Sequence, residues 1–177
     1  MNSQTYISID YAYIIQKNAI VIYPAKNFNF KNFIIQRNFN YELLSSENKI
    51  ILTPGRNLIK LYNSHSKLFA LIKLYAAIFQ SLKLSEIDKI ILILENSYYK
   101  KYLSSYAKLF TVKEIILELF DLCLNKNKSI QREIYYISKR NLHPDTLTVK
   151  KYKSPHITDA LNFLEYYLNN KLKLTKK

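Results

Sequence analysis

The stretch Lys-Ile-Ile-Leu-Ile-Leu-Glu at residues 89–95 decides the fold, because it is a continuous apolar run of strand length. An apolar run without alternation is typical of a strand that is covered on both faces, as in sheets with helices on each side. The run ends at an acidic residue, Glu95. The sequence therefore predicts a central strand, helices on both sides of its sheet, and a carboxylate at the end of that strand.

Two further strands are predicted near the N-terminus. Residues 5–14 are rich in β-branched and aromatic residues, and isoleucine alternates with a polar residue at positions 7–10, which is typical of a strand. Residues 16–18 form a turn, and residues 19–23 form a second strand that Pro24 ends. We expect these two strands to pair as a hairpin.

The pattern is weakest in residues 25–48, which are rich in Asn, Phe and Lys and resemble an insertion. One strand is predicted there, at residues 33–36. Another is predicted at residues 49–52, where the turn residues 53–55, Thr-Pro-Gly, end it.

Helical spacing begins at about Leu58 and predicts one long amphipathic helix that extends to Leu82. A second helix is predicted within residues 97–124 and a third after Ser154-Pro155, which suit an N-cap and a first helical turn. The second helix has two apolar stripes, and we expect it to have two partners. The stripes are Leu103, Ala107 and Phe110, and Leu109, Val112, Ile116, Leu119 and Cys123; that of the last helix is Ile157, Ala160, Leu161, Leu164 and Leu168.

A strand at residues 133–138 and a basic loop at residues 139–153 complete the pattern. The order of elements predicts an α/β domain with a mixed five-stranded sheet flanked by helices. We expect a single domain over residues 1–170 and a frayed basic C-terminal tail over residues 171–177.

Composition excludes several classes of protein. The chain has 177 residues, 27 Lys and Arg against 13 Asp and Glu, and a net charge of +14, which favours a polyanionic partner. Its single glycine, Gly55, excludes glycine-rich phosphate-binding loops, and its single cysteine, Cys123, excludes an internal disulfide. We see neither a membrane-spanning run nor a targeting peptide. We therefore expect a protein of the cytoplasm or an organellar matrix that does not contact a membrane. A viral or phage source also agrees with the sequence.

Four residues form the candidate catalytic and metal-binding site: Asp10, Glu95, His156 and Asp159. Polar groups at strand ends and helix N-termini meet at one edge of such a sheet, so these four can converge. Converging carboxylates select Mg²⁺ or Mn²⁺, and two such ions can hold a phosphodiester during hydrolysis. The three acids also have structural explanations: Glu95 as a solvated turn residue, Asp10 on a solvent face, and Asp159 in a helical first turn that favours acids.

In their order and context, residues 7–10, 91–95 and 154–161 resemble the RuvC-type Holliday-junction resolvases of the ribonuclease H-like superfamily. These stretches read Ile-Ser-Ile-Asp, Ile-Leu-Ile-Leu-Glu and Ser-Pro-His-Ile-Thr-Asp-Ala-Leu. The resemblance implies a ribonuclease H-like fold and a homodimer through the helix at residues 98–124. It also implies that Asp10, Glu95, His156 and Asp159 bind or position two Mg²⁺ ions, with Mn²⁺ as a substitute, to cut branched DNA.

Basic and aromatic residues predict a surface for nucleic acid. Tyrosines beside lysines can stack on bases while the lysines neutralise phosphates. The alternatives are that the tyrosines cover their own helix and that the charges form an ordinary solvated surface. The predicted residues are Tyr98, Tyr99, Lys100, Lys101, Lys139, Arg140, Lys150, Lys151 and Lys153.

The chain also departs from the family pattern. Tyr11-Ala12 stands where the family commonly has a turn with glycine, and only 17 residues separate Ser138 from His156. Two other functions therefore stay open. One is a catalytically inactive ribonuclease H-like nucleic-acid-binding protein, such as a component of an organellar ribosome or nucleoid. The other is an RNA nuclease of the YqgF type, which Ile9-Asp10-Tyr11 also suits.

Overall fold

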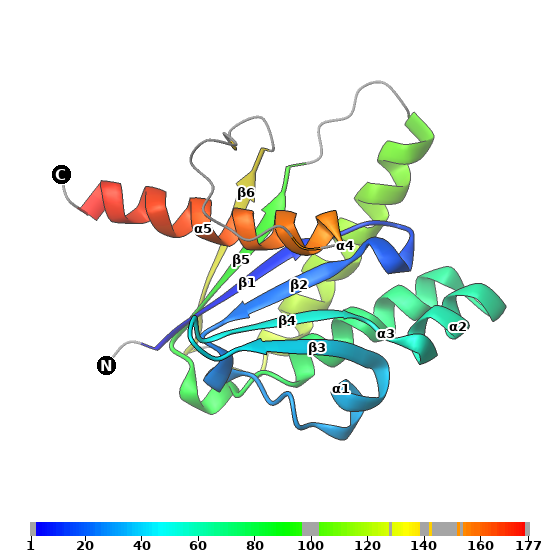
Figure 1. Ribbon diagram of the computed structural model, residues 1–177, viewed down its shortest axis with the longest axis horizontal. Helices are drawn as coiled ribbons and strands as arrows, with labels where there is room; N and C mark the ends of the chain where they lie inside the picture. Colours follow the sequence, from blue (N-terminus) through cyan, green and yellow to red (C-terminus); the bar gives the residue numbers. More distant parts are fainter. Residues whose placement is uncertain are drawn as a thin grey trace.

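The computed structural model describes residues 3–96, 103–127, 129–138, 142, 152 and 154–175. A six-stranded sheet in the order β3-β4-β2-β1-β5-β6 forms its centre (Figure 1). The strands are β1 (Gln4–Asp10), β2 (Ala19–Tyr23), β3 (Phe39–Leu44), β4 (Lys49–Pro54), β5 (Lys89–Glu95) and β6 (Gln131–Ile137). The helices are α1 (Phe33–Asn38), α2 (Arg56–Ser64), α3 (Lys67–Gln80), α4 (Leu103–Leu124) and α5 (Pro155–Thr175), with short 3₁₀ turns at Ile15–Lys17, Ala25–Asn27 and Leu84–Glu86.

Strand directions define a mixed sheet. β1, β5 and β6 run parallel to one another, whereas β2 is antiparallel to both β1 and β4. The five strands β4-β2-β1-β5-β6 have the arrangement of the ribonuclease H-like fold, and β3 adds a sixth at the edge by pairing with β4. The predicted α/β class and the hairpin of the first two strands are confirmed. The predicted number of five strands is wrong by one.

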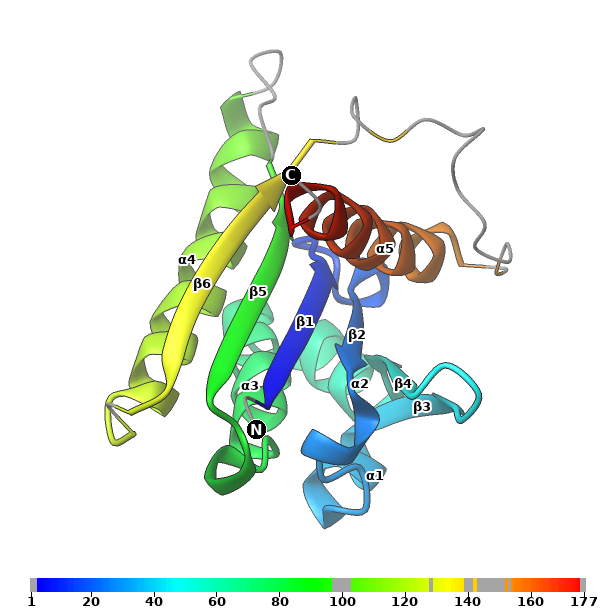
Figure 2. The same cartoon turned by 90° about the vertical axis from the view of Figure 1, so that its left-hand side faces the viewer.

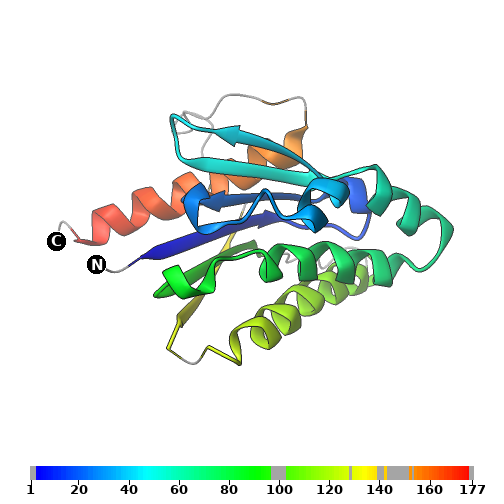
Figure 3. The same ribbon diagram turned by 90° about the horizontal axis from the view of Figure 1, so that it is seen from below.

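Helices cover both faces of the sheet, as the apolar run at residues 89–95 predicts. In β5, Ile90, Leu92 and Leu94 pack into the core under α2, α3 and α4, whereas Ile91 and Ile93 pack into a second core under α5. Figure 2 shows α5 lying across the sheet on one side, and Figure 3 shows α3 and α4 on the opposite side. No helix in the described ranges is long and apolar enough to span a membrane.

The structure corrects the interpretation of residues 25–48. The predicted strand at 33–36 is helix α1, which starts because the Asn32 side chain accepts a hydrogen bond of 2.9 Å from the Ile34 N–H. The strand of this region is β3, whose residues 40–43 are exposed. The turn at residue 55 brings two backbones together: the Gly55 N–H donates to the Asn38 carbonyl at 2.7 Å, and a Cβ on Gly55 would lie 2.9 Å from that oxygen.

The helices also differ from the prediction in their bounds. The long helix predicted from Leu58 is two helices, α2 and α3, and the Ser66 hydroxyl caps the second by accepting from the Phe69 N–H. In α4, Val112 and Ile116 of one stripe are buried and the other residues of that stripe are partly buried, whereas Phe110 of the other stripe is 43% exposed. Helix α5 continues to Thr175, so residues 171–175 of the predicted frayed tail are helical.

Candidate functional site

The candidate site lies where β1 and β5 end and α5 begins. The two strands are parallel neighbours in the register Ile9 with Leu94, so Asp10 and Glu95 are the next residues at the same edge of the sheet. The buried Ser8 hydroxyl donates to the Ala160 carbonyl at 2.6 Å and holds the first turns of α5 against β1. The N-terminal turns of α5 are thereby fixed beside the end of β1.

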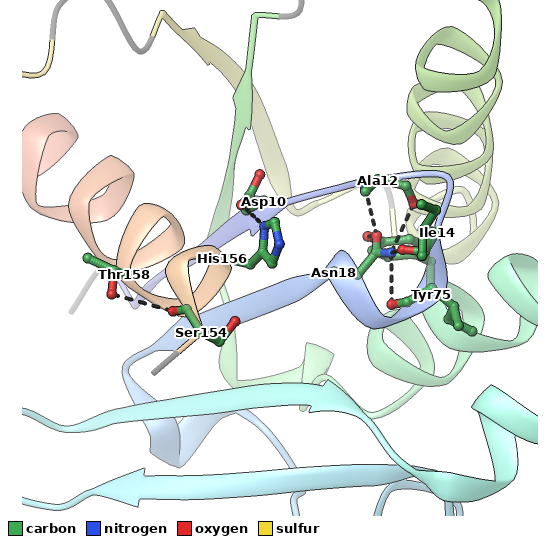
Figure 4. A network of polar contacts seen from close by, with 9 residues as sticks. Asp10, Ala12, Ile14, Asn18, Tyr75, Ser154, His156 and Thr158 are labelled. Atoms are coloured by element: carbon green, nitrogen blue, oxygen red, sulfur yellow. Dashed lines mark hydrogen bonds and ion pairs between the residues drawn. The ribbon is translucent and has the colours of Figure 1, made fainter. Parts of the chain in front are cut away.

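One predicted pair is in direct contact. His156 Nδ1 lies 3.0 Å from Asp10 Oδ2, although the residues are 146 positions apart in the chain (Figure 4). The Asp10 side chain is 5% exposed and the His156 side chain 28%, so the contact joins a buried carboxylate to an imidazole that reaches solvent. An imidazole N–H that donates to a carboxylate fixes the orientation of both groups.

Glu95 lies on the strand that pairs with β1, and Asp159 lies on the same helix as His156. Glu95 is the last residue of β5 and partly buried, and Asp159 is one helical turn beyond His156 in α5 and also partly buried. Within the described part of the chain, no three His, Cys, Asp or Glu side chains form a group that could hold a metal ion.

The donor types fit Mg²⁺ or Mn²⁺, but the side chains are not arranged as a complete coordination shell. Carboxylate oxygens from Asp10, Glu95 and Asp159 are the hard ligands that these ions prefer, and a buried aspartate at a strand end is a suitable first ligand.

A second polar cluster, which the sequence did not reveal, builds the loop that follows Asp10. Asn18 is 1% exposed and accepts a hydrogen bond from the Ala12 N–H at 3.1 Å. Its amide nitrogen lies within donating distance of three carbonyls, those of Ala12 at 2.9 Å and of Ile14 and Ile15 at 3.1 Å. The loop is therefore closed by a side chain in place of the glycine turn that the family resemblance implies.

The Asn18 cluster reaches helix α3 through Tyr75, whose hydroxyl donates to Asn18 Oδ1 (Figure 4). Burial, followed by the nearby Asp10 charge, raises the pKa of Tyr75 well above its ordinary value, so the hydroxyl stays protonated and remains a donor. A single asparagine in a predicted turn gives no sign of this role, because the partner lies 57 residues further along the chain.

Tyr11 joins the two strand ends. Its side chain is buried, and its hydroxyl donates to the Glu95 carbonyl at 3.1 Å. Tyr11 therefore has a structural role, because it ties the end of β1, which carries Asp10, to the end of β5, which carries Glu95.

The predicted nucleic-acid-binding residues lie outside the described ranges. This applies to the aromatic and basic residues at 98–101 and to the basic residues at 139, 140, 150, 151 and 153.

Comparison with known proteins gives similarity in structure alone. No protein-family model matches the chain, and no curated protein matches it in sequence. The chain is similar to Thermus thermophilus RuvC in complex with a Holliday junction substrate, with a TM-score of 0.45, 8% identity, and coverage of 90% of this chain and 89% of that chain. It is also similar to another Thermus thermophilus RuvC structure, with a TM-score of 0.40, 9% identity, and coverage of 90% of each chain.

Proposed function

We propose that this protein is a Mg²⁺-dependent nuclease that cuts branched DNA. The observation that carries the proposal is the contact between Asp10 and His156, because it joins a buried strand-end carboxylate to the start of α5 over a distance of 146 residues. The resemblance of residues 7–10, 91–95 and 154–161 to RuvC-type resolvases supports the same function. The net charge of +14 favours a polyanionic substrate.

The roles follow from where each residue lies. Asp10, Glu95 and Asp159 would hold Mg²⁺, which when bound supplies an activated water and neutralises charge on the phosphate. His156 would orient the Asp10 carboxylate through Nδ1, and its exposed part is accessible to a substrate or a water molecule. Tyr11 and Asn18 would position the end of β1 and the loop that follows it.

A cleavage assay tests the proposal. The wild-type protein is incubated with Mg²⁺ and a labelled four-way junction, linear duplex or structured RNA, beside Asp10→Asn and Glu86→Gln. Glu86→Gln makes the same change of charge at an exposed residue in the turn that precedes β5. We expect junction nicking by the wild type and Glu86→Gln, and a loss of about 100-fold or more in Asp10→Asn. Absence of nicking by the wild type would contradict the proposed nuclease activity. Preferential cleavage of RNA would favour a YqgF-type RNA nuclease.

A second candidate function, non-catalytic binding of branched nucleic acid, is favoured by one observation. Among the described residues no group of three ligating side chains is assembled. Calorimetric titration with Mn²⁺ separates the two functions without a cleavage assay. If the protein is a nuclease, the wild type should bind Mn²⁺ and Asp10→Asn should weaken that binding at least about tenfold. If it is a non-catalytic binding protein, the two should not differ.

We also propose that the protein forms a homodimer through α4. Two large apolar side chains on this helix are exposed, Phe110 at 43% and Leu122 at 62%. Burial of such a surface between two copies would remove it from water. Light scattering after size exclusion should give twice the monomer mass for the wild type and the monomer mass for Leu122→Glu. A monomeric wild type contradicts the proposal.

A further inference from the structure

A groove lies between α1, α2 and α3, on the side of the sheet opposite α5. Its volume is about 510 Å³, and it is lined in part by Leu58, Leu61, Ala76 and Ala77, which form an aliphatic surface. This is the size of sites that hold several side chains or a small ligand. None of the lining residues belongs to the Asp10–His156 pair.

One wall of the groove exposes an unusual amount of apolar surface. Helix α1 buries only Ile35, whereas Phe33 is 70% exposed and Ile34 is 44% exposed, and both line the groove. On the α3 side, Phe69 is 46% exposed and lies one turn before Lys73, which lines the groove. Exposed apolar side chains around a concave surface are typical of an interaction site.

The groove is held in shape before anything binds to it. The Asn57 side chain donates to the Arg37 carbonyl at 3.1 Å, and the Gly55 N–H donates to the Asn38 carbonyl at 2.7 Å. These bonds fix the C-terminal end of α1 against the first turn of α2. Binding therefore requires little ordering of the backbone, which lowers its entropic cost.

All charges that line the groove are positive. Arg37 and Lys73 are the charged lining residues, and each cation lies over an exposed aromatic ring, Arg37 at 5.9 Å from the Phe33 centroid and Lys73 at 5.2 Å from the Phe69 centroid. The complementary occupant has apolar side chains for the aliphatic floor and carboxylates for the two cations.

We propose that this groove binds a short acidic amphipathic segment of a partner protein. The lining has five aliphatic side chains and one aromatic side chain, Phe33, which favours apolar anchors over the bases of a nucleic acid, since bases stack on aromatic platforms. Helix α1, which forms one wall, precedes β3, the strand added to the five-stranded arrangement. The proposal does not depend on nuclease activity.

Fluorescence anisotropy with defined peptides tests the proposal. The probe is a labelled helical peptide with leucines at positions i, i+4 and i+7 and glutamates elsewhere, and the matched peptide carries lysines in place of the glutamates. We expect the wild type to bind the glutamate peptide at least about tenfold more tightly than the lysine peptide, as two partly exposed charge pairs allow. The double variant Arg37→Glu/Lys73→Glu should reverse this preference.

Two controls keep the outcome interpretable. Lys83→Glu changes an exposed charge outside the groove and should leave the preference unchanged, and Phe33→Ser should weaken both peptides about equally. Because residues 33, 37 and 73 are exposed, circular dichroism should be the same for all variants. Equal binding of both peptides, unchanged preference in the double variant, or displacement of the glutamate peptide by single-stranded oligo-dT would overturn the proposal.

Discussion

Two polar clusters border the loop at residues 11–18, and they differ in their partners and in their exposure (Figure 4). Asn18 is 1% exposed and contacts backbone groups of the loop together with the buried Tyr75 hydroxyl. Asp10 contacts His156 by a side chain-to-side chain bond of 3.0 Å, and the histidine side chain is 28% exposed.

This difference indicates that the Asn18 cluster stabilises the fold, whereas the Asp10–His156 pair, whose Asp10 lies eight residues earlier in the chain, is the candidate site. A buried side chain that satisfies backbone groups is costly to change, because each orphaned group loses water as well as its partner. A side-chain pair that reaches solvent can exchange partners, which a metal ion or substrate requires. Stability should therefore depend mainly on Asn18, and function mainly on Asp10.

Reciprocal isosteric changes provide the strongest test of this contrast. Asn18→Asp replaces an amide beside three carbonyls with a group that, when ionised, cannot donate to any of them. We expect a loss of about 3 kcal/mol or more in the free energy of unfolding, measured by urea denaturation. Asn40→Asp, at an exposed position of β3, makes the same change and should cost less than about 0.5 kcal/mol. Equal costs at the two positions would show that Asn18 is not a scaffold residue.

Removal of the Tyr75 hydroxyl gives a smaller effect at the same cluster. Tyr75→Phe keeps the ring in the core and removes the donor to Asn18 Oδ1, which still accepts from the Ala12 N–H. We expect the free energy of unfolding to fall by about 1–2 kcal/mol. Combination with Asn18→Ala in a double-mutant cycle should give a total loss below the sum of the two single losses, and strict additivity would contradict the coupling.

The elements that surround the site could be predicted because their patterns are local. The unbroken apolar run of β5 and the Ser154-Pro155 start of α5 each determine one element and its position. Candidate site residues were found for the same reason, since an acid at the end of an apolar strand is visible in a short window. The structure places Asp10 in contact with His156, and the catalytic and metal-binding roles of the four residues stay predictions.

The missed features depend on contacts between distant parts of the chain. The Asn18 amide is explained by Tyr75, 57 residues away, and Tyr11 by the Glu95 carbonyl, 84 residues away. Strand β3 lies at the edge of the sheet and pairs with β4, and its residues 39–43 alternate between apolar and polar, a local signal that the prediction missed. Helix α1 resembles a strand in sequence because its apolar residues 33–35 are consecutive, although only Ile35 of that helix is buried.

Substitution of Asp10 at the candidate site should change the stability of the fold little. Asp10→Asn keeps the shape of the side chain and an acceptor or donor for His156 Nδ1, and it removes a buried charge. We expect the free energy of unfolding to change by less than about 1 kcal/mol, even in a variant that has lost nuclease activity. A loss as large as that of Asn18→Asp would assign Asp10 to the scaffold instead.

The smallest effect concerns a second partly exposed pair, Lys89 and Glu133, whose Nζ and Oε2 atoms lie 2.8 Å apart on β5 and β6. The hydrogen bond from Lys89 lowers the pKa of Glu133, burial opposes this shift, and the hydrogen bond from Tyr167 adds to the lowering. Because the folded pKa lies below the unfolded one, the stabilisation is complete above the unfolded pKa of about 4.3 and disappears as the pH falls through the folded pKa.

This pair should contribute less than about 1 kcal/mol, because solvent screens a glutamate side chain that is 36% exposed. The measurement is urea denaturation of the wild type and Glu133→Gln between pH 7 and pH 3. We expect a small constant difference down to about pH 5 that shrinks below about pH 4.3. In a Lys89→Gln background the pH-dependent part should be strongly reduced. A difference in the free energy of unfolding that grows on acidification would mean that the folded state raises the pKa of Glu133. A loss of stability in Glu133→Gln as large as that of Asn18→Asp would contradict the distinction between pairs that reach solvent and the buried Asn18 cluster.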